Sequence, residues 1–156
     1  MTGEQHVVIS YRWFHYSVFL TSEYRSSNLE DKSVVDRFYD WSKEHSYLTF
    51  WRDDQNETRD HLDDDMMLSI QNCSLIVAFV GDAYLESQNC TSEITYAETL
   101  RKEILIVRLQ KDLVLFGRGP ISLIASAKQI VRVSIQFKKF KVVFRLITTK
   151  MKAITS

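Results

Sequence analysis

The chain has 156 residues, of which 45% are apolar and 26% charged, and its 20 basic residues balance its 20 acidic ones. This length and composition predict one globular domain over residues 1–156, and the balanced charge argues against broad binding of nucleic acid. The two cysteines, Cys73 and Cys90, form neither a disulfide framework nor a metal-binding spacing, so we expect a cytoplasmic protein without a bound metal. The apolar segment near the N-terminus is too short for a signal peptide or a transmembrane helix, so no membrane contact is expected.

Five short apolar runs along the chain predict strands. They cover residues 6–10, 47–51, 74–80, 103–109 and 129–133. The first, third and fourth runs barely alternate between apolar and polar residues, which is typical of strands that are covered on both faces of a parallel sheet.

Segments with a helical period lie between and after these runs. Their apolar stripes are Val34, Val35, Phe38 and Trp41, with Asp31 as N-cap; Leu62, Met66 and Ile70; Ile94, Ala97 and Leu100 or Arg101; and Phe140, Phe144, Ile147 and Met151. The last segment is basic on its other face, which would suit a membrane surface, but a final helix that covers the sheet is favoured. The alternation predicts an α/β fold: a flavodoxin-like open five-stranded parallel sheet with helices on both faces.

The carboxyl ends of the strands are where ligands bind in such a sheet. After the first run the sequence reads SYRWFHY, without glycine, which excludes a dinucleotide-binding G-x-G-x-x-G motif and a phosphate-binding P-loop. Its bulky aromatic residues disfavour a flavodoxin, and Tyr11 and Arg12 stand where a phosphoacceptor receiver domain has paired acids. The loop at residues 12–30 is unusually long, and long loops are often functional.

Four segments at the predicted strand ends occur in a characteristic order. They are VVISYRW, LTFWRDD, SIQNCSLIVAFVGDAYLES and a Ser-x-x-Cys-x-x-Glu-apolar motif formed by Ser87, Cys90, Glu93 and Ile94. In this order they resemble the Toll/interleukin-1 receptor (TIR) domain family. The resemblance is clear over about residues 6–109 and weaker over 110–156. The chain departs from the family in its long loop at 12–30, in the lack of glycine in RDDQNETRDHL, and in the lack of a late aromatic motif.

The resemblance implies two possible functions, because some TIR domains only bind one another and others cleave NAD between nicotinamide and ribose. In the NAD-cleaving branch the catalytic acid is the Glu of the motif, which here is Glu93. Breaking that bond develops positive charge on the ribose, which a carboxylate can stabilise. We therefore expect an NAD hydrolase that uses NAD as substrate, needs no cofactor, forms ADP-ribose or a cyclic isomer, and acts in immune or cell-death signalling.

The residues expected to contact NAD come from the strand ends and from the motif. They are Ser10, Tyr11, Arg12, Trp51, Asp53, Ser87 and Cys90. The guanidinium of Arg12 suits a pyrophosphate, or an ion pair with Asp53 or Asp54. Tyr11 and Trp51 could stack on a base or on nicotinamide, or pack at the rim, and Asp53 could hold a ribose hydroxyl.

Simpler interpretations of the motif residues also exist. Glu93 could be a solvated acid near the start of a helix, where the helix dipole favours negative charge. Cys90 has no His nearby in sequence and is favoured as a small core residue over a nucleophile. Ser87 is favoured as a turn or cap residue.

The rival function is a non-enzymatic adaptor that signals by self-association through residues 52–62 and the surface around them. The family usually works as an assembly, so a homo-oligomer or filament is expected under either hypothesis. A third hypothesis is that the protein is a related α/β enzyme that transfers nucleosides. The first two hypotheses differ in what they require of Glu93.

Overall fold

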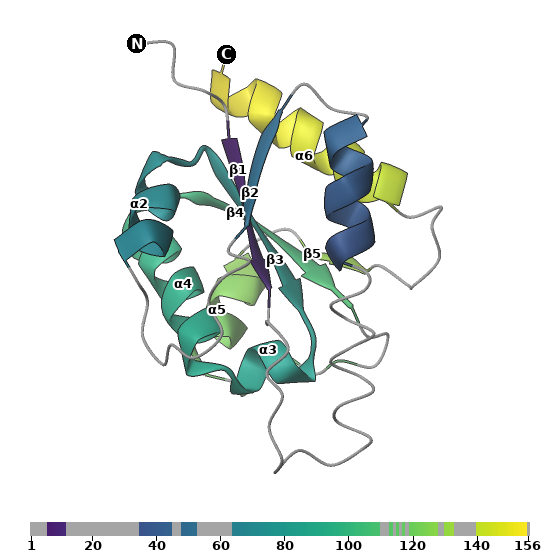
Figure 1. Cartoon of the computed structure of the whole chain (residues 1–156). Helices are drawn as coiled ribbons and strands as arrows, with labels where there is room; N and C mark the ends of the chain where they lie inside the picture. Colours follow the sequence, from purple (N-terminus) through teal and green to yellow (C-terminus); the bar gives the residue numbers. More distant parts are fainter. Residues whose placement is uncertain are drawn as a thin grey trace.

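The computed structural model describes residues 6–11, 35–44, 48–52, 64–109, 113, 115, 117, 119–127, 130–132 and 140–155. The strands are β1 His6–Tyr11, β2 Thr49–Arg52, β3 Leu75–Val80, β4 Glu103–Arg108 and β5 Ile130–Arg132. The helices are α2 Asp64–Asn72, α3 Asp82–Glu86, α4 Gln88–Thr99, α5 Pro120–Ala127 and α6 Phe140–Thr155, and residues 35–44 are also helical. The helices lie on both faces of a parallel sheet, which confirms the predicted α/β architecture (Figure 1).

The sheet has the strand order β2-β1-β3-β4-β5, and every neighbouring pair is parallel. Four strands have four to six residues each, and the edge strand β5 has three. From β1 the chain moves to one side to form β2, and then crosses back to form β3 on the other side of β1. The boundary between β1 and β3 is therefore the switch point of the sheet, outside which ligands bind in open α/β folds.

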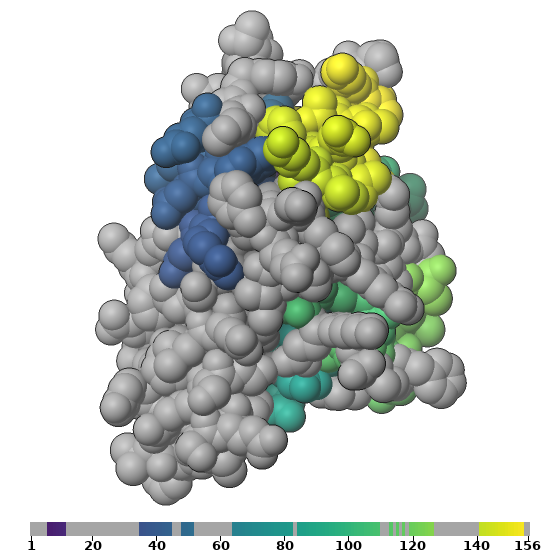
Figure 2. Space-filling view, turned by 90° about the vertical axis from the view of Figure 1, so that its right-hand side faces the viewer, coloured from purple at the N-terminus to yellow at the C-terminus, as the bar shows by residue number. Residues whose placement is uncertain are grey.

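One face of the sheet is covered by the helical residues 35–44 and by α6. The buried side chains of α6 there are Val143, Ile147 and Met151. Phe38 is fully buried, and its ring lies 5.2 Å from that of Phe79 between centroids. Figure 2 shows residues 35–44 and α6 side by side at the surface of this layer. The prediction that the final helix packs on the sheet is confirmed.

The apolar stripe of α6 is rotated slightly from the expected one. Val143 is buried, whereas Phe144 is half-buried and contacts the ring of Trp41 edge-on, with centroids 5.2 Å apart. The larger ring fits at the seam between two helices, and the smaller valine fits against the strands. Phe140 was also expected on this stripe, and its side chain lies outside the described part of the chain.

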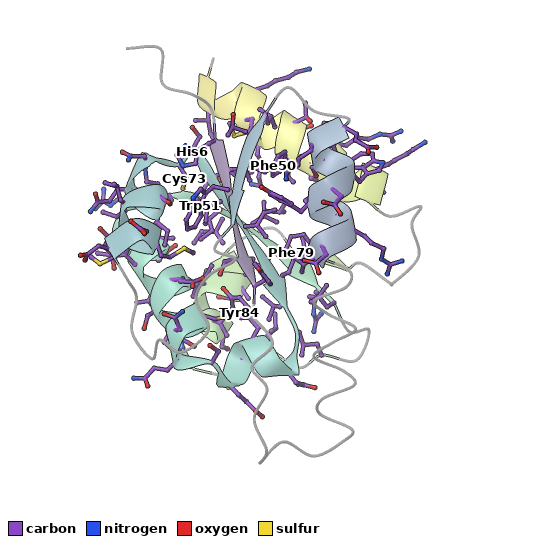
Figure 3. The ribbon with its side chains drawn as sticks, in the orientation of Figure 1. His6, Phe50, Trp51, Cys73, Phe79 and Tyr84 are labelled. Carbon is purple, nitrogen blue, oxygen red and sulfur yellow. The ribbon has the colours of Figure 1, made fainter. Side chains whose placement is uncertain are left out.

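The other face is covered by α2, α4 and α5, which share a second core cluster. Met66 and Ile70 of α2 and Ile94 and Ala97 of α4 are buried in it, as their spacing predicts. Figure 3 shows Trp51 and Cys73 toward α2, and Phe50 and Phe79 on the side of α6.

Strand β1 sends alternate side chains to the two faces. Val7, Ile9 and Tyr11 belong to the cluster under α6, and Val8 belongs to the cluster under α4. The same period of two places Ser10 on the α4 face, near the carboxyl end of the strand.

Helix α4 ends in a turn that the sequence did not reveal. Arg101 has a φ of 56°, and its N–H bonds to the carbonyl of Glu98, while the N–H of Lys102 bonds to the carbonyl of Ala97. These two bonds form a Schellman motif, which closes a helix with one left-handed residue. Leu100 and Arg101 are both exposed, so the expected third position of the α4 stripe is wrong.

Within the described ranges, no helix has both the length and the apolar character needed to cross a membrane.

Candidate active site

The start of helix α4 is fixed by Ser87. Its Oγ accepts a hydrogen bond of 3.2 Å from the backbone N–H of Cys90, and its carbonyl accepts one of 3.0 Å from the hydroxyl of Thr91. The side chain is buried and satisfies one of the N–H groups that a helix start leaves without a partner. The prediction that Ser87 is a cap residue is confirmed.

Cys90 connects α4 to the end of β1. Its side chain is buried in the second core cluster, which α2, α4 and α5 share, and its Sγ donates a hydrogen bond of 3.6 Å to the carbonyl of Tyr11. This position fits the prediction of a small packing residue. The contact also brings the first turn of α4 against the carboxyl end of β1, and so to the carboxyl edge of the sheet, where the motif was expected to lie.

Glu93 lies on the same side of α4 as Cys90, one turn further along. Its side chain is only 5% exposed, although α4 is a surface helix. Its Oε2 accepts a hydrogen bond of 2.5 Å from Oγ of Ser10, and its Oε1 accepts one of 3.4 Å from Nδ2 of Asn89. The interpretation of Glu93 as a solvated acid is therefore wrong, and α4 has no acidic residue in its first turn for its dipole to favour.

Tyr84 completes the cluster from the short helix α3. Its hydroxyl lies 2.7 Å from Oγ of Ser10, and both side chains are about 1% exposed. Burial is the main reason why the pKa of Tyr84 lies well above its usual value, and the nearby Cys90 and Glu93 raise it further, while the hydrogen bond to Ser10 lowers it. The tyrosine therefore keeps its proton.

Tyr84 contacts Ser10 and Asn89 contacts Glu93, and the sequence predicted neither residue as part of the site. Tyr84 follows β3 by a few residues in the segment GDAYLES, so it lies at the carboxyl edge of the sheet, where ligand-binding residues were expected. That location was a usable signal for Tyr84. Asn89 lies four residues before Glu93 on one helix face, but nothing in the sequence indicates that this face is buried.

The other expected site residues lie in different places. Trp51 is half-buried on the α4 face and is paired in register with Val8. It therefore lies nearer to the amino ends of the strands than Ser10 does. The side chain of Tyr11 packs on the opposite face, under α6, and is not brought together with the Glu93 carboxylate. Arg12 and Asp53 lie outside the described residues.

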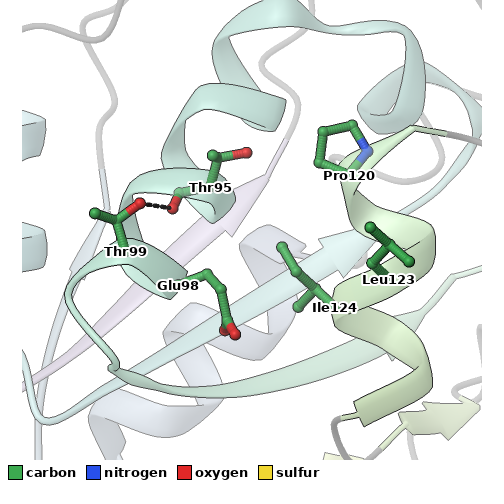
Figure 4. Close-up of a pocket in the computed structure, with 6 residues that line it drawn as sticks. All are labelled: Thr95, Glu98, Thr99, Pro120, Leu123 and Ile124. Atoms are coloured by element: carbon green, nitrogen blue, oxygen red, sulfur yellow. Dashed lines mark hydrogen bonds between the residues drawn. The ribbon is translucent and has the colours of Figure 1, made fainter.

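A separate shallow groove of about 310 Å³ lies between α4 and α5 (Figure 4). Its lining residues are Thr95, Glu98, Thr99, Pro120, Leu123 and Ile124. Glu93 is not among them, so this groove and the buried carboxylate are different features. Among the residues that the structure places, no group of three His, Cys, Asp or Glu side chains could hold a metal ion.

Comparison with known proteins identifies the architecture. A family model described as TIR domain matches residues 7–139, which include the Ser10, Tyr84 and Glu93 cluster. The curated proteins give no match to the chain.

Proposed function

Because the chain belongs to the TIR domain family, we propose that it cleaves NAD at the bond between nicotinamide and ribose, with Glu93 as the catalytic carboxylate. The family includes NAD-cleaving enzymes as well as signalling adaptors. The choice between them has to come from the residues of this chain.

The observation that carries the proposal is the burial of Glu93 near the switch point of the sheet. Among the side chains that the structure describes, it is the one charged side chain that is buried. An ionised carboxylate loses much of its hydration on burial, which costs free energy unless hydrogen bonds replace it. Ser10 supplies such a bond. In these surroundings of low polarity, the carboxylate would interact more strongly with a developing positive charge than it would in water.

The proposed reaction needs no proton for its leaving group. The bond between C1′ of the ribose and the nicotinamide nitrogen breaks, and its electron pair goes to the nitrogen, so the pyridinium leaves as neutral nicotinamide. Positive charge develops on the ribose, and Glu93 stabilises it or orients the ribose hydroxyls. Water then adds to C1′ and loses a proton to give ADP-ribose, or an adenine nitrogen adds to give a cyclic isomer. Arg12 and Asp53 are proposed to hold the rest of the NAD molecule.

The test compares Glu93→Gln with Glu98→Gln. Both residues lie on α4, but Glu98 is exposed, so its variant controls for the loss of one acid. Concentrated, crowded protein is incubated with NAD, and the products are separated by chromatography. Glu93→Gln should lower nicotinamide release by at least about 100-fold, as removal of one charge-stabilising group commonly does, and Glu98→Gln should retain it. Wild-type protein that releases no nicotinamide would refute the proposal.

Self-association without catalysis is the second candidate function, since TIR domains generally self-associate. Leu123 on the outside of α5 supports it, because this side chain is 77% exposed at the edge of the α4–α5 groove. Residues 52–62, which we expected to mediate the contact, lie mostly outside the described part of the chain.

A further inference from the structure

We propose that Tyr84 is a positioning residue that acts through Ser10 to orient the Glu93 carboxylate and keep it ionised. The proposal rests on the proposed function of Glu93 and adds a residue that touches neither the carboxylate nor the substrate. Tyr84 lies in α3, Ser10 in β1 and Glu93 in α4. The two hydrogen bonds therefore join three elements at the switch point.

Counting donors sets the direction of these hydrogen bonds. An ionised carboxylate can only accept, so the single hydroxyl proton of Ser10 is used on Oε2 of Glu93 at 2.5 Å. The short contact between Ser10 and Tyr84, at 2.7 Å, then requires the tyrosine to be the donor. The proton of Tyr84 also has the carbonyl of Cys90 as a weaker acceptor at 3.5 Å. The two distances favour donation to Ser10.

Protonation of Glu93 would weaken or reverse this series of hydrogen bonds. A proton on Oε1 would leave Ser10 bonded to a neutral carbonyl oxygen, which is a weaker acceptor than a carboxylate. A proton on Oε2 would make Glu93 the donor to Ser10 and Ser10 the donor to Tyr84, and Tyr84 would have to turn its proton to the Cys90 carbonyl. The bond from Tyr84 to the Cys90 carbonyl is long, at 3.5 Å. When Glu93 is ionised, the bonds from Tyr84 to Ser10 and from Ser10 to Glu93 are both 2.7 Å or shorter. Since hydrogen bonds weaken with distance, the arrangement favours the ionised form of Glu93.

The same geometry separates the roles of the two carboxylate oxygens. Oε2 carries the short bond from Ser10, while Oε1 carries the longer contact of 3.4 Å with Asn89 on the same helix. The short bond fixes the orientation of the carboxylate. Because Tyr84 is fully buried, it holds this arrangement without reaching the substrate.

The experiment uses Tyr84→Phe, which keeps the ring and removes only the hydroxyl. Tyr96→Phe is the matched control, since Tyr96 is a half-buried tyrosine of α4 whose hydroxyl contacts Gln71. Nicotinamide release is measured against pH, and kcat is separated from KM. Tyr84→Phe should lower kcat about 2- to 10-fold with KM changed less than about twofold, which matches the loss of one hydrogen bond. The acidic limb of the profile should move up by about half to one pH unit.

A second measurement does not depend on catalysis. In protein with 13C-labelled glutamate, the Glu93 carboxyl signal is assigned by its loss in Glu93→Gln and is followed against pH. Its titration midpoint should rise in Tyr84→Phe and in Ser10→Ala, and stay unchanged in Tyr96→Phe. Because Tyr84 acts through Ser10, Tyr84→Phe should have no further effect in a Ser10→Ala background.

The outcomes separate the two proposals. If wild-type protein releases no nicotinamide, NAD cleavage is refuted, while the carboxyl titration still decides the role of Tyr84. If cleavage is present and Tyr84→Phe leaves both the pH profile and the titration unchanged, the positioning role is overturned and the catalytic role of Glu93 stands. If Tyr84→Phe does not fold, an unchanged titration in Ser10→Ala overturns the positioning role.

Discussion

Oγ of Ser10 lies 2.5 Å from Oε2 of Glu93, although the two residues are 83 positions apart in the chain. The bond joins β1 to α4, the second helix after β3, across the switch point of the sheet. It therefore combines two tasks, since it pins α4 to the sheet and supplies a donor to a buried carboxylate.

Removing the Ser10 hydroxyl should destabilise the fold because it leaves the carboxylate with one donor fewer in a buried place. Ser10→Ala should lower the free energy of unfolding by about 1–3 kcal/mol, measured by urea unfolding followed by circular dichroism. Ser126→Ala is the control, since Ser126 is exposed and bonds to a carbonyl of its own helix. Combining Ser10→Ala with Glu93→Met should cost less than the sum of the two changes. Simple additivity would show that the two side chains are not coupled.

Ser87 should be replaceable by another capping residue. Ser87→Asn keeps a side-chain oxygen for the Cys90 N–H, whereas Ser87→Ala removes it and should cost about 1 kcal/mol of stability. Nicotinamide release should be retained in Ser87→Asn. Loss of release in a stable Ser87→Asn protein would instead assign the Ser87 hydroxyl to the substrate, as the sequence motif left open.

Alkaline pH should reveal the burial of Cys73. Burial raises the pKa of this thiol from its usual 9.0 to about 11, against a smaller opposing effect of Lys102. The folded-state pKa is the higher one, so the contribution to stability is complete below pH 9 and is lost as the pH rises from 9 to about 11. The slope approaches at most about 1.4 kcal/mol per pH unit.

Urea unfolding at pH 8 to 10 tests this dependence with Cys73→Ala as the comparison. The variant should show a flatter loss of stability between pH 9 and 10, a range in which the raised pKa of Tyr84 contributes little. Identical pH dependence of the two proteins would contradict the assignment to Cys73. In the native protein at pH 8, Cys73 should also react slowly with thiol reagents, because the thiolate is the reactive form.

The surface at α5 should contribute to self-association. Leu123→Glu places a charge where an apolar side chain is now 77% exposed, so it should weaken association without lowering stability. Leu68→Glu on α2 is the control, since Leu68 is also an exposed leucine and does not line the α4–α5 groove. The mass distribution is measured by analytical ultracentrifugation over a range of concentrations. If Leu123→Glu and Leu68→Glu weaken self-association equally, the α5 surface has no special role in it.

The sequence predicted those features that repeat along the chain. Unbroken apolar runs marked the strands, and the spacing of Met66 with Ile70 and of Ile94 with Ala97 marked the buried faces of two helices. The order of motifs then indicated that Glu93 belongs at the carboxyl edge of the sheet. Period and order are local properties, so they can be recognised without coordinates.

The contacts within the site could not be predicted in this way. Ser10 and Tyr84 are 74 positions apart, and their bond depends on how α3 lies over the sheet. The burial of Glu93 likewise depends on the packing of α4, since helix period alone leaves a charged residue on the solvent side by default. The left-handed Arg101 was hidden because glycine, its usual signal, is absent there.

Helix α4 is closed at both ends, by the Ser87 cap and by the turn at Arg101. An α-helix rotates by about 100° with every residue. An inserted or deleted residue between Ser87 and Glu93 would thus swing the carboxylate away from Ser10, and the fixed ends give the helix no room to slide back. This stretch should therefore tolerate many single substitutions but no change in length, so a scan of one-residue insertions would outline the functional segment more sharply than a scan of alanines.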